Sequence, residues 1–161
     1  MRERYGNMWD FANEYDAVCI LTNMEVRNGC NIMGAGSARE AAQRYPQLPY
    51  IYGQMLLSFP RPNLAESPFA MALLPDEKPV VMAFATKSFV SEPSSVNLIE
   101  RSCLDLARII MEMGWKSVLL PRPGCGKWTG QLDWDKDVKP ICEQYLPHDI
   151  VTIAHYEMEI K

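Results

Sequence analysis

Two glycine-rich segments carry most of the chemistry that this sequence can be expected to perform. The first, Asn31 to Ser37, joins a strand-like run to a helical run and contains Gly34 and Gly36. Glycines let a backbone turn sharply and approach a ligand closely. Because the first amides of a helix are unpaired and carry partial positive charge, phosphate is their favoured ligand. Ser37 and Glu40 match an S-x-x-E capping box, which predicts that the helix begins just after the glycines.

The second segment, residues 121–130, reads Pro-Arg-Pro-Gly-Cys-Gly-Lys-Trp-Thr-Gly and follows the apolar run Val118 to Leu120. In open α/β sheets, ligands bind outside the carboxyl ends of the strands. Two glycine loops at that edge can hold a diphosphate between them, and the pair is a more specific signal than either loop alone. Lys87 follows a third apolar run and adds a cation.

Two common nucleotide-binding motifs do not fit these loops. A dinucleotide fingerprint that starts at Gly34 needs a glycine at position 39, which is Arg39. A P-loop needs a glycine at position 121 and Ser or Thr after Lys127, where the chain has Pro121 and Trp128.

Alternating strands and helices position these loops. The clearest element is a helix over 96–113, where apolar residues recur at steps of three and four; Ser94 or Ser95 can cap its start and Gly114 its end. Asp133 can cap a later helix, in which Pro140 predicts a kink or a late start. The expected strands are 17–21, 69–74, 80–86, 116–120 and 150–156, and the other expected helices are 37–45 and 48–57. The spacer between 74 and 80 predicts a hairpin. This alternation predicts an α/β fold with a mostly parallel sheet and helices on both faces.

The composition favours one domain and disfavours several classes of partner. The chain has 161 residues, a formal net charge of −4 and a sequence pI of about 5.2. Such a chain is not expected to bind nucleic acid or membrane surfaces non-specifically. Its five cysteines lack C-x-x-C spacing and its two histidines are isolated, so neither a disulfide framework nor a metal site is indicated. With no signal peptide and no membrane-spanning run, we expect a soluble, cytoplasmic monomer.

The chemistry-bearing positions together resemble the macro domain, and more closely the branch that contains DarG and terminal ADP-ribose protein glycohydrolase. The likeness runs from about residue 5 to 156 and is carried by Asn23, Met33 to Gly36, Thr86-Lys87, Pro121 to Gly126 and Leu132 to Trp134. It implies a single macro domain over residues 1–161, with a three-layer α/β/α fold around a central mixed, mostly parallel sheet. It also implies ADP-ribose as the ligand, with no cofactor and no metal.

The resemblance also implies roles for individual residues. Lys87 matches the family's catalytic lysine, and Asn23 the asparagine that contacts the distal ribose. The implied ligand-binding residues are Asn7, Met8, Asn23, Ile32, Met33, Gly34, Ala35, Gly36, Ser37, Pro123, Gly124, Cys125, Gly126, Lys127 and Trp128.

Several of these positions can serve the structure as well as a ligand. Asn23 can equally tie a turn at a strand end, and Trp128 can be a lid or an exposed loop aromatic. Cys125 fits a small side chain packed behind the loop better than a reactive thiol, and Asp133, the acid nearest the second loop, fits a helix cap. Asn7 stands where many macro domains place an aspartate that bonds adenine.

The activity that the resemblance implies is a metal-independent ADP-ribosyl hydrolase. Its substrate would be mono-ADP-ribosylated DNA, modified at thymidine, or protein, modified at an acidic side chain. Lys87 can act as an ammonium that stabilises charge, or as an amine that forms a Schiff base with the opened ribose. Two alternatives stay open: a phosphatase that acts on ADP-ribose 1″-phosphate, and a non-catalytic ADP-ribose reader.

Overall fold

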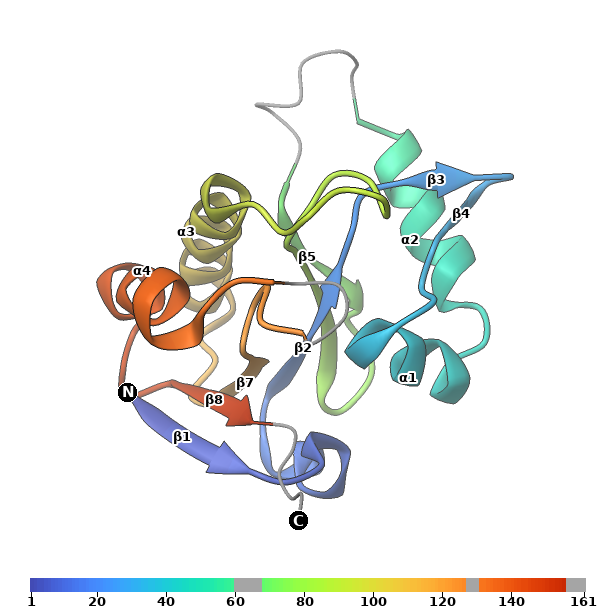
Figure 1. Ribbon diagram of the computed structural model, residues 1–161. Helices are drawn as coiled ribbons and strands as arrows, with labels where there is room; N and C mark the ends of the chain where they lie inside the picture. Colours follow the sequence, from blue (N-terminus) through green and yellow to red (C-terminus); the bar gives the residue numbers. More distant parts are fainter. Residues whose placement is uncertain (60–67, 127–130, 156–161) are drawn as a thin grey trace.

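A six-stranded sheet forms the centre of the fold. The computed structural model describes residues 1–59, 68–126 and 131–155. The loop predicted at 59–68 lies almost wholly outside these residues. The strand order is β1-β8-β7-β2-β6-β5, and every neighbouring pair is parallel except the hairpin of β5 with β6 (Figure 1). The strands are β1 Arg2–Tyr5, β2 Ala17–Thr22, β5 Ala70–Leu74, β6 Val80–Ala85, β7 Val118–Pro121 and β8 Val151–His155.

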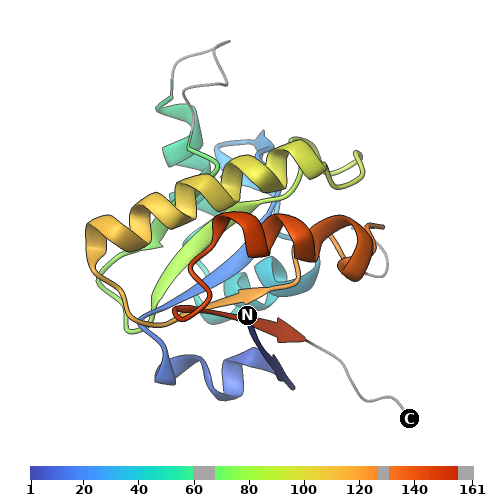
Figure 2. The same ribbon diagram turned by 90° about the vertical axis from the view of Figure 1, so that its left-hand side faces the viewer.

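Helices cover both faces of this sheet. The helices α1 (Gly36–Arg44) and α2 (Leu48–Leu57) lie on one face, while α3 (Val96–Met113) and α4 (Lys139–Tyr145) lie on the other (Figures 1 and 2). The predicted three-layer α/β/α fold with a mixed, mostly parallel sheet is therefore confirmed.

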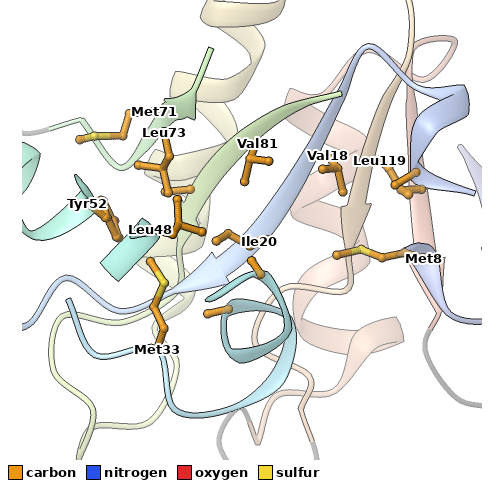
Figure 3. Close-up of a cluster of buried hydrophobic side chains, with 14 of the residues drawn as sticks. Met8, Val18, Ile20, Met33, Leu48, Tyr52, Met71, Leu73, Val81 and Leu119 are labelled. Atoms are coloured by element: carbon orange, nitrogen blue, oxygen red, sulfur yellow. The ribbon is translucent and has the colours of Figure 1, made fainter. Parts of the chain in front are cut away.

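The two faces of β2 explain why this strand is apolar from Ala17 to Leu21. Val18 and Ile20 pack into the cluster beneath α1 and α2, whereas Ala17 and Cys19 pack into the cluster beneath α3 and α4 (Figure 3). A strand that is buried on both faces has no solvent side on which to alternate polar residues. The centre of the sheet is thus filled with apolar side chains, and polar function falls to the strand ends.

Most predicted elements are found with small changes at their ends. Helix α3 has the predicted bounds; Ser95 Oγ accepts a hydrogen bond from Leu98 N at 3.2 Å, and Gly114 is left-handed at φ 70°. Asp133 caps a π-helical turn, Trp134–Val138, and α4 starts at Lys139 directly before Pro140. The late start follows because proline fits only the first turn of a helix.

The predicted capping box is wrong. The N-cap of α1 is Ala35, with no side-chain cap, and the helix already begins at Gly36. Ser37 Oγ instead accepts a hydrogen bond from Leu21 N at 2.9 Å, and Glu40 accepts one from the indole of Trp9. The reason lies in the sheet, since β7 pairs with β2 only at Ala17 and Val18, and the amide of Leu21 needs another acceptor.

Five short elements were not predicted from the sequence, and the first of them is the edge strand β1 (Arg2–Tyr5). The other four are the 3-10 turns Met8–Asp10 and Ala12–Glu14, and the strands β3 (Val26–Arg27) and β4 (Cys30–Asn31), which form a hairpin. In the part of the chain that the structure describes, no helix is both long enough and apolar enough to span a membrane.

Candidate functional site: a pocket at the carboxyl ends of three parallel strands

The pocket forms where the chain leaves neighbouring strands toward opposite faces of the sheet. From β2 the chain proceeds to α1 on one face, while from β6 it proceeds to α3 on the other. Such a divergence opens a crevice at the carboxyl ends of parallel strands. The crevice has a volume of about 260 Å³ and is lined by residues that follow β2, β6 and β7.

Nine of the predicted site residues line this pocket. The structure therefore brings these residues together at one cavity, and their contacts with a ligand remain a prediction. The nine are Asn23, Ile32, Gly34, Ala35, Gly36, Ser37, Lys87, Gly124 and Gly126.

The two glycine loops present bare backbone in different ways. No atom of the described residues lies within 4 Å of a Cβ built on Gly34 or on Gly36, so these residues leave the space beside both glycines open. Gly36 has φ +61° and Gly124 has φ +72°, a region that side chains disfavour. At Gly124 a Cβ would also meet Ile99, Leu132 and Ser94 at 2.9–3.0 Å. The first loop is open toward a ligand, whereas the second is packed closely from behind.

Hydrogen bonds between loops hold the strand ends in place. Thr86 N donates to Thr22 O at 2.9 Å, which continues the pairing of β2 with β6 by one residue. The buried hydroxyls of Thr22 and Tyr52 lie 3.2 Å apart, and burial raises the pKa of Tyr52 to about 12, so this phenol stays neutral. With Ser37 bound to Leu21, both α1 and α2 are tied to the end of β2.

The side chain of Asn23 fixes the loop that enters the pocket. Its Nδ2 donates to Ile32 O at 2.8 Å, and its Oδ1 accepts from Glu25 N at 2.9 Å and from Asn31 Nδ2 at 3.0 Å. The structural role considered for Asn23 is thus confirmed. It does not displace the functional one, since Asn23 also lines the pocket and an amide nitrogen carries two hydrogens.

Lys87 stands at the mouth of the pocket, on the loop that joins β6 to α3. Its Nζ donates to Val90 O at 3.2 Å, and Val90 itself lines the pocket. This loop is attached to the base of the β3–β4 hairpin, because Met24 N donates to Ser88 O at 3.1 Å. A cation is therefore held beside the two glycine loops.

Five other predicted residues do not line the pocket. Asn7 is exposed and caps the turn after β1, accepting from Trp9 N at 3.0 Å. Met8 and Met33 are core residues beneath α1, and Figure 3 shows both within that cluster. The other two, Pro123 and Cys125, lie in the second loop without lining the cavity, and Lys127 and Trp128 lie outside the described residues.

Cys125 is packed rather than reactive. Its Sγ donates to Pro123 O at 3.3 Å, and burial raises the pKa of this thiol to about 12. A thiol with such a pKa is protonated at neutral pH and is a poor nucleophile. Asp133 also has a structural role, because its Oδ1 accepts from Lys136 N at 2.9 Å and it does not line the pocket.

Several pocket residues were not in the predicted set. Thr22 ends β2 and Thr86 directly follows β6, so the rule that ligands bind at carboxyl ends was a sufficient signal for both. Val90 and Ser94 reach the pocket through the path of the β6–α3 loop, for which the sequence holds no local signal. Leu21 and Ala38 complete the wall.

The pocket offers backbone amides at the start of α1, an amide side chain and a cation. These groups suit a ligand that carries phosphate together with hydroxyl groups. Within residues 1–59, 68–126 and 131–155, no three His, Cys, Asp or Glu side chains are grouped so as to hold a metal ion.

Comparison with known structures identifies this architecture. No protein-family model matches the chain, and no curated protein matches it in sequence. The macrodomain of Thermus aquaticus DarG is 22% identical with a TM-score of 0.73, over 98% of this chain and 97% of that chain. The macrodomain of Mycobacterium tuberculosis DarG is 23% identical with a TM-score of 0.71, over the same shares of the two chains. Thermosipho africanus DarTG, solved in complex with ADP-ribose, is 20% identical with a TM-score of 0.73, over 100% of this chain and 43% of that chain. The resemblance inferred from the motifs is confirmed at the level of architecture: this chain has the macrodomain fold.

Proposed function

We propose that this protein binds ADP-ribose in the pocket and hydrolyses the bond that joins ADP-ribose to a macromolecule. The macromolecule would be DNA modified at thymidine or protein modified at an acidic side chain. The observation that carries the proposal is the position of Lys87, beside two glycine loops in a single pocket. The T. africanus neighbour with ADP-ribose supports the choice of ligand.

The groups of the pocket match the parts of ADP-ribose. The open backbone at Gly34 and Gly36 suits the diphosphate, because amides at a helix start donate to anionic oxygens without the need for a basic surface. This feature reconciles an acidic chain with a doubly charged ligand. Asn23, at the end of β2, is suited to hydroxyl groups of the distal ribose.

Lys87 is proposed to act on C1″ of the distal ribose. As an ammonium it stabilises negative charge on the leaving group while water attacks C1″. As an amine it adds to C1″ of the opened ribose and expels the macromolecule, and water then cleaves the resulting imine, which returns the amine and free ADP-ribose. Neither route requires a metal ion.

The test compares the wild type with Lys87→Ala, Lys87→Arg and Lys78→Ala. Lys78 provides a matched loss of charge just before the start of β6, away from the pocket, where its Nζ forms an exposed ion pair with Asp16 at 3.4 Å. The substrates are thymidine-ADP-ribosylated single-stranded DNA and glutamate-ADP-ribosylated protein, with free ADP-ribose measured by mass spectrometry in buffer containing EDTA. We expect turnover by the wild type and Lys78→Ala, and loss of about 10²-fold or more in Lys87→Ala, since a charge in such a site is worth several kcal/mol.

Lys87→Arg separates the two chemical roles. Arginine keeps the charge but cannot form an imine, so retained activity indicates the electrostatic route and lost activity indicates the Schiff base. Full activity of Lys87→Ala would refute the role of the lysine. If ADP-ribose stabilises the wild type against heat but no substrate is cleaved, the protein is a reader. Release of phosphate from ADP-ribose 1″-phosphate would instead establish a phosphatase.

A further inference from the structure

Val90 is held at both of its backbone polar groups, and each bond connects it to a charged side chain. Its N–H donates to Glu25 Oε1 at 2.9 Å, and its carbonyl accepts from Lys87 Nζ at 3.2 Å. A carboxylate and the proposed catalytic ammonium therefore form hydrogen bonds with the backbone of the same residue. The backbone of Val90 thus links the carboxylate of Glu25 to the ammonium of Lys87.

Glu25 is itself fixed, so it can serve as an anchor. Its side chain is only 14% exposed, and its Oε2 forms an ion pair with Arg27 Nε at 2.8 Å. Its own N–H donates to Asn23 Oδ1 at 2.9 Å, while its carbonyl accepts from Asn31 Nδ2 at 3.0 Å. Each polar group of Glu25 thus has a partner in the segment that follows β2.

The β3–β4 hairpin that follows Glu25 rests on α2. Gln54 Nε2 donates to Gly29 O at 3.1 Å, and Gly53 leaves no room for a Cβ against the backbone of Cys30 and Asn31. Because α2 is in turn bonded to Thr22 through Tyr52, the anchor is continuous with the core.

We propose that Glu25 is a positioning residue, which fixes the ammonium of Lys87 at the pocket by holding the backbone of Val90. This inference rests on the proposed function of Lys87. It assigns Glu25 no contact with the substrate; the carboxylate acts only as a hydrogen-bond acceptor. The hydrogen bond from Val90 N, followed by Arg27, keeps the pKa of Glu25 below its usual range, so the acceptor is charged at neutral pH.

Glu92 offers a matched control within the same loop. Its Oε1 accepts from Phe89 N at 3.3 Å, so it too is a carboxylate that binds a backbone amide one residue away from Val90. Glu92 is exposed and does not line the pocket. Glu92→Ala therefore removes the same charge and the same type of bond without releasing Val90.

The experiment measures kcat and KM of Glu25→Ala, Glu25→Gln, Glu25→Asp and Glu92→Ala on whichever ADP-ribosylated substrate the wild type cleaves. A misplacement of about 1 Å can cost about 10²-fold in rate. We expect kcat to fall 10- to 100-fold in Glu25→Ala with KM within threefold, and Glu92→Ala to stay within twofold. Glutamine keeps an acceptor at the same reach and should retain most of the activity. Aspartate is shorter by one C–C bond of about 1.5 Å and should lose it.

Comparing the activities of Glu25→Gln and Glu25→Asp shows whether Glu25 acts through its hydrogen bond or through its charge. This comparison holds even if Glu25→Ala does not fold. Asp above Gln would overturn the proposal, because the charge of Glu25 would then matter more than its reach. Equal losses in Glu25→Ala and Glu92→Ala would overturn it as well.

A second readout does not depend on activity. Reductive methylation of Lys87 by formaldehyde and cyanoborohydride, followed by peptide mass spectrometry, should be several-fold faster in Glu25→Ala and Glu25→Asp than in the wild type or Glu92→Ala. If the wild type cleaves no substrate, the proposed function fails while this measurement still tests the link. An unchanged methylation rate in all variants would show that Glu25 does not hold the lysine.

Discussion

Gly124 allows the packing around the second glycine loop to be tested against a matched glycine. Both Gly124 and Gly114 have a left-handed backbone, at φ +72° and φ +70°. An alanine at either position meets the steric cost of that conformation, ~1–2 kcal/mol. Only at Gly124 does the new Cβ also meet neighbours, at 2.9 Å from Ile99 Cδ1, 2.9 Å from Leu132 Cδ1 and 3.0 Å from Ser94 Cβ.

The two kinds of neighbour respond differently to the added methyl group. The terminal methyls of Ile99 and Leu132 can turn aside by rotation, but the Cβ of Ser94 moves only with its backbone. Overpacking of this type costs ~1–3 kcal/mol. We therefore expect Gly124→Ala to lose about 2–5 kcal/mol of unfolding free energy in total, and Gly114→Ala about 1–2 kcal/mol. The gain from a stiffer unfolded chain is the same for both variants and cancels in their difference.

The assay is urea unfolding of the wild type and both variants, combined with thermal unfolding in the presence and absence of ADP-ribose. For a chain of this size, each kcal/mol corresponds to about 2–4 °C in Tm. Because Ser94 and Gly124 both line the pocket, Gly124→Ala should also reduce the stabilisation by ADP-ribose, whereas Gly114→Ala should leave it unchanged. Equal losses of stability in the two variants would refute the packing argument, and unchanged binding by Gly124→Ala would show that this loop does not shape the pocket.

Two further predictions concern the first glycine loop and Asp16, which lies at the amino end of β2. Gly34→Ala should keep the unfolding free energy within about 0.5 kcal/mol, because its Cβ meets no described atom within 4 Å. It should raise the Kd for ADP-ribose, measured by calorimetry, about tenfold or more, since a charge-assisted hydrogen bond is worth ~1.5–3 kcal/mol. Unchanged affinity would remove this loop from the ligand site. The backbone amide of Lys116, which donates to Asp16 Oδ2 at 2.7 Å, is the chief cause that holds the pKa of Asp16 below its usual range. The stability that the Asp16 carboxylate contributes is therefore complete above about pH 4. It is lost as the pH falls through the lowered pKa of the native state. Asp16→Asn should therefore lose ~1 kcal/mol in urea unfolding at pH 7 and approach the wild type at pH 3; a gap that stays constant with pH would contradict this account.

Local signals in the sequence sufficed for the four helices and for the five longer strands of the sheet, to within a few residues, but not for the contacts between them. Helix α3 was predicted with its observed bounds because its apolar period, its capping serine and Gly114 agree with one another. The capping box at Ser37 failed because the unpaired amide of Leu21, sixteen residues earlier in the chain, competes for the same hydroxyl. Local rules describe one helix at a time, so they cannot include an acceptor that the sheet requires.

Some residues of the candidate site could be predicted from local sequence signals, and others could not. Gly34, Gly36 and Gly124 were recognisable because glycines between a strand and a helix are typical of loops that bind phosphate. Val90 was not, since its place depends on a hydrogen bond to Glu25, 65 residues away. Such pairings can be inferred only after the fold has brought the two segments together.

Several polar groups of this pocket already form hydrogen bonds within the protein when no ligand is bound. Thr22 binds Tyr52, Ser37 binds Leu21 and Asn23 binds Ile32. Buried polar atoms need partners in the free protein, because an unsatisfied one costs ~1–3 kcal/mol. The same bonds keep the strand ends from relaxing, so a ligand should meet a pocket that is already arranged and should spend little of its binding energy on ordering it. The groups left to contact a ligand are then the open backbone of the first loop, the Asn23 amide and the ammonium of Lys87, so the hydrolysis that we propose depends on how Lys87 is anchored.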